Sequence, residues 1–145
     1  MTHGILMPPH AYVPGQTARH AEDWFDAIKA SVTEKTPVDA LADTSAFRAG
    51  LAYLEAGYFW ECHEVLEAVW MRTPPGTEER EMVQALIQLA NARLKLRMDR
   101  PKAAMRLCDM VEEHVRRLPR DKAILGQHAA ALAKAVEGVR GGIKR

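Results

Sequence analysis

Apolar residues recur every three or four positions along most of this chain, and no stretch alternates apolar and polar residues for long enough to form a strand. The pattern predicts an all-α fold, a compact array of five to six helices. Residues that cap or break helices divide the pattern into expected helices at 17–36, 45–57, 58–72, 77–98, 100–118 and 123–137. The second helix can begin at Asp43, Thr44 or Ser45, and Gly57 separates it from the third in a tight helix-turn-helix.

The two ends of the chain differ from the periodic part. Residues 1–16 contain Pro8, Pro9 and Pro14, which argue against regular structure, yet they are too apolar for a free tail. We expect an ordered N-terminal arm at 1–16, a single helical domain at 17–137 and a frayed tail at 138–145.

The expected helix at 77–98 is apolar around almost its whole circumference, so it should be the central helix. Its short connection to the helix at 58–72 predicts that the two pack antiparallel. A polar stripe interrupts the apolar surface of this central helix, and buried amides need partners. We therefore expect the stripe to close over the carboxylates of the helix at 58–72, with Glu61 level with Gln88. The stripe consists of Gln84, Gln88, Asn91 and Lys95.

The helix at 58–72 carries the candidate chemistry. One side is apolar, and the other side gathers Glu61, His63, Glu64 and Glu67 around Trp60. An indole among acidic residues indicates that this side is covered, and covered carboxylates require a cation, hydrogen-bond donors or a proton. His20, one turn before Trp24, is expected to be a surface histidine.

Composition narrows the class of protein. A chain of 145 residues with 48% hydrophobic residues is long enough for one buried core. Two cysteines offer no disulfide framework, and no apolar run approaches the length of a membrane span, so we expect a cytoplasmic protein without a membrane partner. Residues 1–92 carry a net charge of −7 and residues 93–145 one of +8. This polarity favours docking of one half on the other, or a homo-oligomer, over nucleic-acid binding.

The order Glu61-Cys62-His63-Glu64-Val65-Leu66-Glu67, followed by Trp70 and by the segment from Gln84 to Ala90, resembles the domain of unknown function 309 family. The resemblance covers about residues 45–118. It implies an all-helical fold with Glu61, His63, Glu64, Glu67 and Gln88 as signature positions, in a family described as predicted metal-dependent hydrolases without an established substrate. Cys62 departs from the alanine that the family often has.

The spacing His63-Glu64-x-x-Glu67 is like the H-E-x-x-H helix of zinc peptidases, so His63 and Glu67 can share a cation while Glu64 activates a water. Glu61 is the further candidate ligand. Such carboxylate-rich ligands favour Mn, Fe or Mg over a structural Zn, and the enzymatic interpretation implies a small-molecule substrate. The alternative is a metal-free network with Trp60 and the amide stripe, in a protein that binds a ligand or a partner segment, and the sequence leaves both open.

Overall fold

The computed structural model describes residues 4–143. Within this range the chain forms six α-helices and one 3-10 helix, without a strand. The elements are α1 (Asp26–Lys29), η1 (Val38–Asp43), α2 (Ser45–Ala56), α3 (Phe59–Trp70), α4 (Glu78–Arg97), α5 (Pro101–Arg116) and α6 (Ala129–Ile143). No helix in this range is long and apolar enough to cross a membrane.

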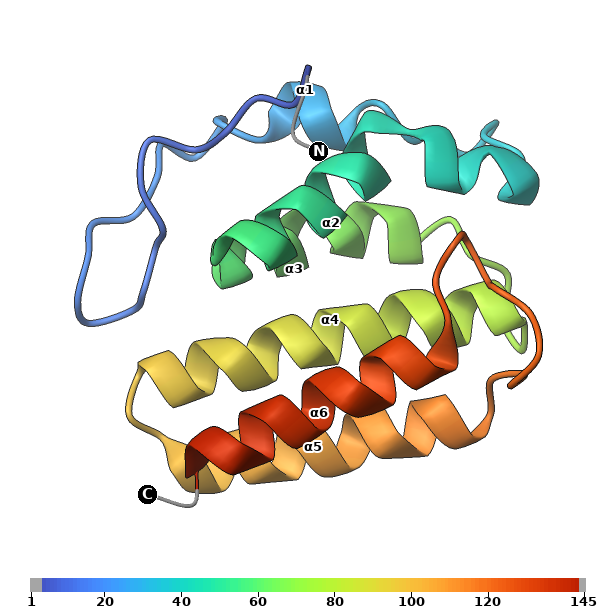
Figure 1. The fold of residues 1–145 in the computed structure, drawn as a ribbon. Helices are drawn as coiled ribbons and strands as arrows, with labels where there is room; N and C mark the ends of the chain where they lie inside the picture. Colours follow the sequence, from blue (N-terminus) through green and yellow to red (C-terminus); the bar gives the residue numbers. More distant parts are fainter. Residues whose placement is uncertain (1–3, 144–145) are drawn as a thin grey trace.

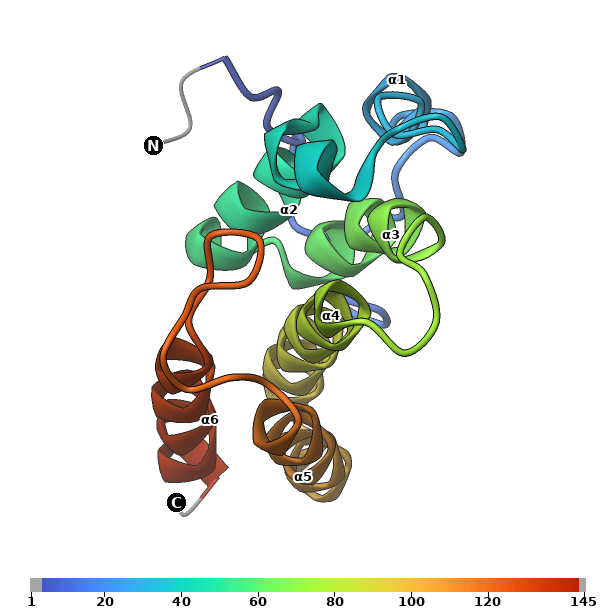
Figure 2. The same ribbon diagram turned by 90° about the vertical axis from the view of Figure 1, so that its right-hand side faces the viewer.

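The helices lie in two layers (Figure 1). The N-terminal segment, η1, α2 and α3 form one layer, and α4, α5 and α6 form the other. Figure 2 shows α4 in the middle of the molecule, where it packs against α3, α5 and α6. The prediction of an all-helical array with a central helix packed antiparallel on α3 is confirmed.

Local capping explains where the central helices begin and end. Thr44 and Thr77 cap α2 and α4, each accepting a hydrogen bond from the backbone N–H three residues later. Gly57 ends α2 with a φ of 92°, a conformation that glycine adopts without a steric penalty. Pro101 occupies the first turn of α5, where its missing N–H costs nothing. These boundaries agree with the sequence prediction.

The expected helix at 17–36 is wrong, because only Asp26–Lys29 is α-helical and turns surround it. Thr17 does not cap a helix. Its hydroxyl accepts a hydrogen bond from the Val13 N–H and donates one to the Ala11 carbonyl, so it closes a turn of the N-terminal arm. The apolar residues Phe25 and Val32 are buried as the periodicity requires, but tertiary contacts rather than helix propensity hold this segment.

The last helix also differs from the prediction, because it begins at Ala129 rather than at Ala123. A tight turn precedes it, in which Ile124 and Gln127 exchange two backbone hydrogen bonds and Leu125 and Gly126 have positive φ. The helix continues to Ile143, so residues 138–143 are not frayed; 144–145, like 1–3 of the predicted arm, lie outside the described residues. Buried Val139 and the ion pairs of Arg140 outweigh the cost of Gly138, Gly141 and Gly142.

At Gly50, α2 packs tightly against the Leu66 side chain of α3. A Cβ at Gly50 would lie 2.4 Å from Leu66 Cδ2 and 2.7 Å from Leu66 Cγ, and Leu66 is fully buried. Gly50→Ala should therefore lower the free energy of unfolding by about 1 to 3 kcal/mol, because overpacking outweighs the gain in helix propensity.

Denaturant unfolding measures this effect, with Gly138→Ala as the matched helical control. A Cβ at Gly138 meets no atom within 4 Å, so this change should stabilise the protein by about 0.5 to 1 kcal/mol. Equal effects of the two substitutions would contradict the close approach.

Candidate functional site

The polar side of α3 is covered by the N-terminal segment rather than by α4. Glu61 is 0% exposed, and its Oε2 accepts hydrogen bonds from the Tyr12 backbone N–H at 2.6 Å and from His20 Nε2 at 2.5 Å. The His20 side chain is only 2% exposed, so the expectation of a surface histidine is wrong. The buried Glu61 carboxylate thus binds two separate residues of the N-terminal segment, Tyr12 and His20, to α3. We call this pair of hydrogen bonds the Glu61 clamp.

Aromatic rings surround this buried pair. Trp60 meets Tyr12 edge to face at 5.1 Å between ring centroids, and it also contacts Phe25 and His20. The ring of His10 lies 4.6 Å from that of His20. Trp60 therefore lies among the acidic residues of α3 because the N-terminal segment packs on it.

The amide stripe of α4 does not close over the α3 carboxylates. Gln84, Gln88 and Asn91 are half-buried, and the hydrogen bond within the stripe joins Asn91 Nδ2 to Gln88 Oε1 at 3.4 Å. No hydrogen bond among residues 4–143 joins an α4 amide to Glu61, which is bonded to Tyr12 and His20 instead. The expected closure of the amide stripe over Glu61 is thus wrong. Lys95 lines a separate hollow together with residues of α5.

Three of the sequence-predicted site residues do converge on the outer side of α3. One ligand atom from each of His63, Glu64 and Glu67 can be chosen so that all lie within 4.8 Å of one another. His63 Nδ1 lies 2.6 Å from the Trp60 carbonyl oxygen, so it donates there and leaves the Nε2 lone pair free. That Nε2 lies 3.8 Å from Glu67 Oε2. Glu61 does not belong to this cluster.

Exposure differs among the three side chains. His63 is 20% exposed and Glu64 24%, so both are partly covered as predicted, whereas Glu67 is 56% exposed. Lys29 of α1 forms an ion pair with Glu64 Oε2. The cluster is therefore open to solvent at Glu67 and closed by a lysine at Glu64.

Two other buried groups face the N-terminal arm and α4. The Tyr53 hydroxyl donates to the Leu6 carbonyl at 2.6 Å, and burial, followed by the negative charge of Glu61, raises the pKa of Tyr53 to about 12. Burial also raises the pKa of the Cys62 thiol, despite the opposing charge of Arg93. Cys62 therefore stays protonated and inert near neutral pH.

The raised pKa of Tyr53 predicts a loss of stability at alkaline pH. The unfolded tyrosine ionises above about pH 10, while the folded one keeps its proton up to about pH 12. The contribution is fully present below pH 10 and is lost as the pH rises towards 12, in total about 2 to 3 kcal/mol. Denaturant unfolding between pH 9 and 11.5 should show a shallower decline in Tyr53→Phe than in the wild type. Parallel declines would contradict the prediction.

Sequence reasoning missed three residues of this region: Tyr12, His20 and Lys29. All come from the segment before α2, 35 to 49 residues away from their partners on α3. The one signal in the sequence was the position of His20 a turn before Trp24, within a segment whose apolar residues had to pack on something.

Together, the fold and the site define a small all-helical protein that carries a histidine and two carboxylates on one face of a helix next to its central helix. Residues 47–107 match the family described as Domain of unknown function (DUF309), which confirms the resemblance. The match spans most of α2, all of α3 and α4 and the first turns of α5, and thus includes the cluster but not Tyr12, His20 or Lys29. No curated protein and no solved structure matches the chain.

Proposed function

We propose that the protein binds one divalent cation through His63, Glu64 and Glu67 and acts as a metal-dependent hydrolase. The observation that carries the proposal is the convergence of three donors within 4.8 Å, with the His63 ring fixed by its bond to the Trp60 carbonyl. Metal-binding histidines commonly donate their second ring N–H to a carbonyl or a carboxylate, which orients the ligand nitrogen.

The chemistry of the donor set fits a divalent ion. One imidazole and two carboxylates suit Mn, Fe or Mg, and three protein ligands with an open position also suit a catalytic Zn. The ion would supply Lewis acidity to a hydrolytic water. His63, Glu64 and Glu67 would hold it, with His63 and Glu67 one turn apart on α3.

Glu64 has two roles in this proposal: one carboxylate oxygen would bind the ion, and the other would act as general base towards the water. Its carboxylate is partly covered, and the ion pair with Lys29 restricts its orientation. Exposed Glu67 leaves the cluster accessible from solvent, so a small-molecule substrate can approach without a conformational change.

The first test is titration of dialysed protein with Mn²⁺, Zn²⁺ and Mg²⁺ by calorimetry. We expect binding of one ion per chain by the wild type and by Glu113→Gln, a control on α5, but not by Glu67→Gln. The loaded and the dialysed proteins are then assayed on phosphate esters, carboxylic esters and amides. Binding without hydrolysis would reject the enzymatic half of the proposal, and the absence of binding would reject both halves.

A second candidate function is a binding or assembly module in which these residues fix the packing. The clamp of Glu61 on Tyr12 and His20 and the pair of Glu64 with Lys29 favour this alternative, because both tie the N-terminal segment to α3. Under this alternative, Glu67→Gln changes neither ion binding nor stability, because the Glu67 carboxylate makes no hydrogen bond within residues 4–143 and only a long contact to His63.

A further inference from the structure

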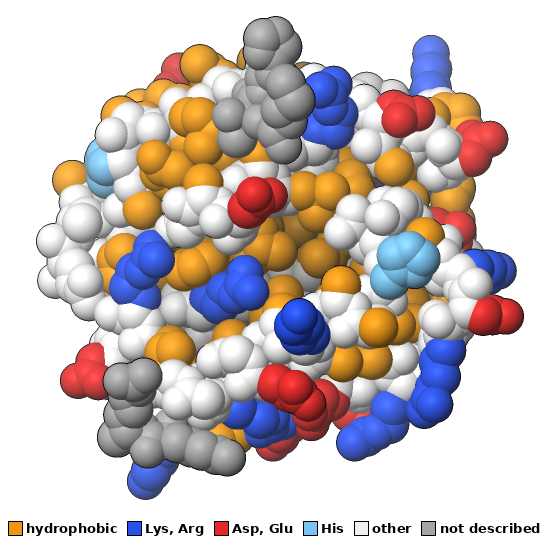
Figure 3. Space-filling model, in the orientation of Figure 1, with side chains coloured by type: hydrophobic (Ala, Val, Ile, Leu, Met, Phe, Trp, Pro, Cys, Tyr) orange, Lys and Arg blue, Asp and Glu red, His pale blue; other side chains and the backbone are white. Residues whose placement is uncertain are grey.

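A groove crosses the face of the molecule where α2, α4 and α6 meet, and it shares no residue with the cation cluster. Its volume is about 530 Å³. Figure 3 shows hydrophobic side chains exposed in a hollow on this face, with charged side chains around it. The apolar lining comes mainly from Leu51, Leu54, Leu86, Leu89, Leu132 and Ala135.

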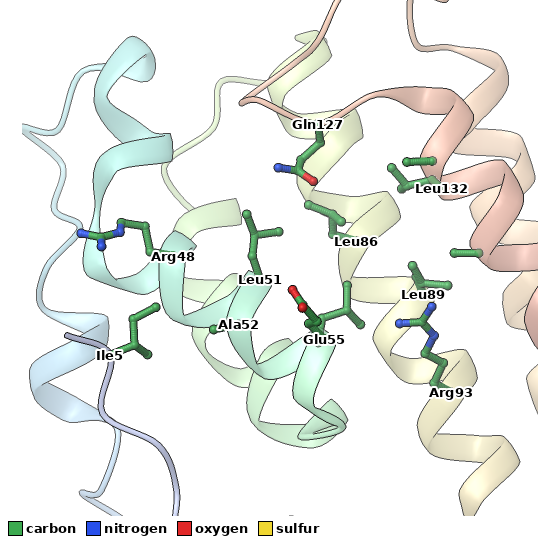
Figure 4. Close-up of a pocket in the computed structure, with 13 residues that line it drawn as sticks. Ile5, Arg48, Leu51, Ala52, Glu55, Leu86, Leu89, Arg93, Gln127 and Leu132 are labelled. Carbon is green, nitrogen blue, oxygen red and sulfur yellow. The ribbon is translucent and has the colours of Figure 1, made fainter. Parts of the chain in front are cut away.

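The polar groups of the groove are few and lie at different places (Figure 4). Gln127, held by the tight turn before α6, lies at one end, and Arg93 of α4 lies beyond Leu89 with Glu55 of α2 nearby. The Arg48 side chain points away from the other lining residues of α2 and α4. A long apolar floor with a few placed polar groups, in a volume of this size, is typical of small-ligand sites.

Arg93 is the group in the groove whose surroundings favour binding of an anion. It is half-buried, it makes no ion pair within residues 4–143, and burial lowers the pKa of its guanidinium. A partly desolvated cation with no carboxylate at ion-pair distance is unfavourable, and an anion placed beside it would relieve that cost.

Leu86, Leu89 and Arg93 are spaced three and four residues apart, so they line one face of α4. Seven residues of helix separate Leu86 from Arg93, a length of about 10 Å at 1.5 Å per residue. An acyl chain of roughly eight to twelve carbons spans this floor with its head group at Arg93.

A second hollow of about 420 Å³ continues from Arg93 and Ala135 along α4 and α6 towards Arg97. The guanidinium of Arg97 lies over the Phe59 ring and donates to the Gly57 carbonyl, so it is fixed in place. This hollow gives a head group room beyond the apolar floor, next to a second positive charge.

We infer that this groove binds a single-chain amphiphile with an anionic head group, the chain lying on Leu86 and Leu89 and the head at Arg93. The anion is a carboxylate or a phosphate, both of which a guanidinium binds through paired N–H donors.

Calorimetric titration of the full chain with decanoate, decyl phosphate and decyltrimethylammonium, all below their micelle concentrations, tests the inference. We expect saturable binding of one decanoate or decyl phosphate per chain and none of the cationic amphiphile. The comparison of the two anions shows which head group is preferred. On addition of decanoate to the wild-type protein, the NMR chemical shifts of the backbone amides should change most at Leu86, Leu89 and Leu132. This measurement locates the ligand without a variant.

Charge variants give opposite expected results. Arg93→Gln should weaken binding of the anions about tenfold or more, the effect of losing a charged hydrogen bond. Glu55→Gln should tighten it, because a negative charge beside the head group is removed, and Arg72→Gln, outside the groove, should leave it unchanged. Ala135→Phe should block the groove, with thermal unfolding as the check on its fold.

Equal affinity for the cationic amphiphile, or unchanged affinity in Arg93→Gln, would overturn the inference. So would a dimer in ultracentrifugation that decanoate does not dissociate and that Ala135→Phe disrupts, because a second copy would then occupy the groove.

Discussion

Glu61→Ala is expected to lower the free energy of unfolding by about 3 to 5 kcal/mol, the range measured when one partner of a buried pair is removed. The substitution leaves His20 Nε2 and the Tyr12 N–H without their acceptor inside a closed aromatic environment, and it opens a cavity. Denaturant unfolding measures the loss. Hydrogen exchange at the Tyr12 amide should accelerate as well, because its acceptor is gone.

Two controls separate the buried clamp from a general effect of charge on α3. Glu67→Ala without added metal removes an exposed carboxylate and should change stability by no more than about 0.5 kcal/mol. The double variant Glu61→Met, His20→Phe should recover much of the loss, because an apolar pair strands fewer polar groups. Glu61 Oε1 and His20 Nδ1 are buried without a hydrogen-bond partner in residues 4–143. The double variant removes both atoms and their desolvation cost, which adds to the recovered stability. A loss for Glu61→Ala as small as that for Glu67→Ala would contradict the clamp.

The helices that sequence reasoning placed well are those whose ends are set locally. Thr44, Gly57, Thr77 and Pro101 act within three or four residues of their own positions, so their effect is readable without the rest of the fold. The central position of α4 could also be predicted from the sequence, because a helix that is apolar around its whole circumference must be buried on all sides.

The backbone conformation of the N-terminal segment could not be predicted from the local pattern, because it depends on contacts with residues distant in the sequence. The helical spacing of the apolar residues is consistent with the burial of Phe25 and Val32, but the backbone there follows turns. The segment is held by Glu61 and by the Tyr53 hydroxyl, which lie 41 to 49 residues from the residues that they contact. Nothing in the local pattern specifies such contacts.

The candidate site was half predictable for the same reason. The i, i+4 spacing of His63 and Glu67 follows from helix geometry alone, so their proximity could be expected. That the acidic side of α3 is covered was inferred from Trp60, but the cover was assigned to the amides of α4. Which of two neighbouring segments covers a helix face depends on how the helix is rotated about its axis. Buried Cys62, Val65 and Leu66 set this rotation by their packing.

His63→Ala is expected to weaken binding of Mn²⁺ or Zn²⁺ by about 100-fold or more, since loss of an outer-shell partner alone commonly costs 10- to 100-fold. The His63 ring supplies the one nitrogen ligand of the cluster and is only partly buried, so the fold should survive its removal. Calorimetric titration of the purified variant measures the affinity, with thermal unfolding as the check on structure.

Lys29→Met should have the opposite effect and strengthen cation binding about tenfold or more. The ammonium of Lys29 neutralises Glu64 and also repels a divalent ion at the same carboxylate. Removing it frees the carboxylate and ends the repulsion, and both effects raise the affinity for the ion. Lys35→Met removes an equal charge from the same segment at an exposed position and should leave the affinity unchanged. If Lys29→Met and Lys35→Met bind the ion equally, Glu64 is not a ligand, and the proposed site shrinks to His63 and Glu67, too few to hold a catalytic ion tightly.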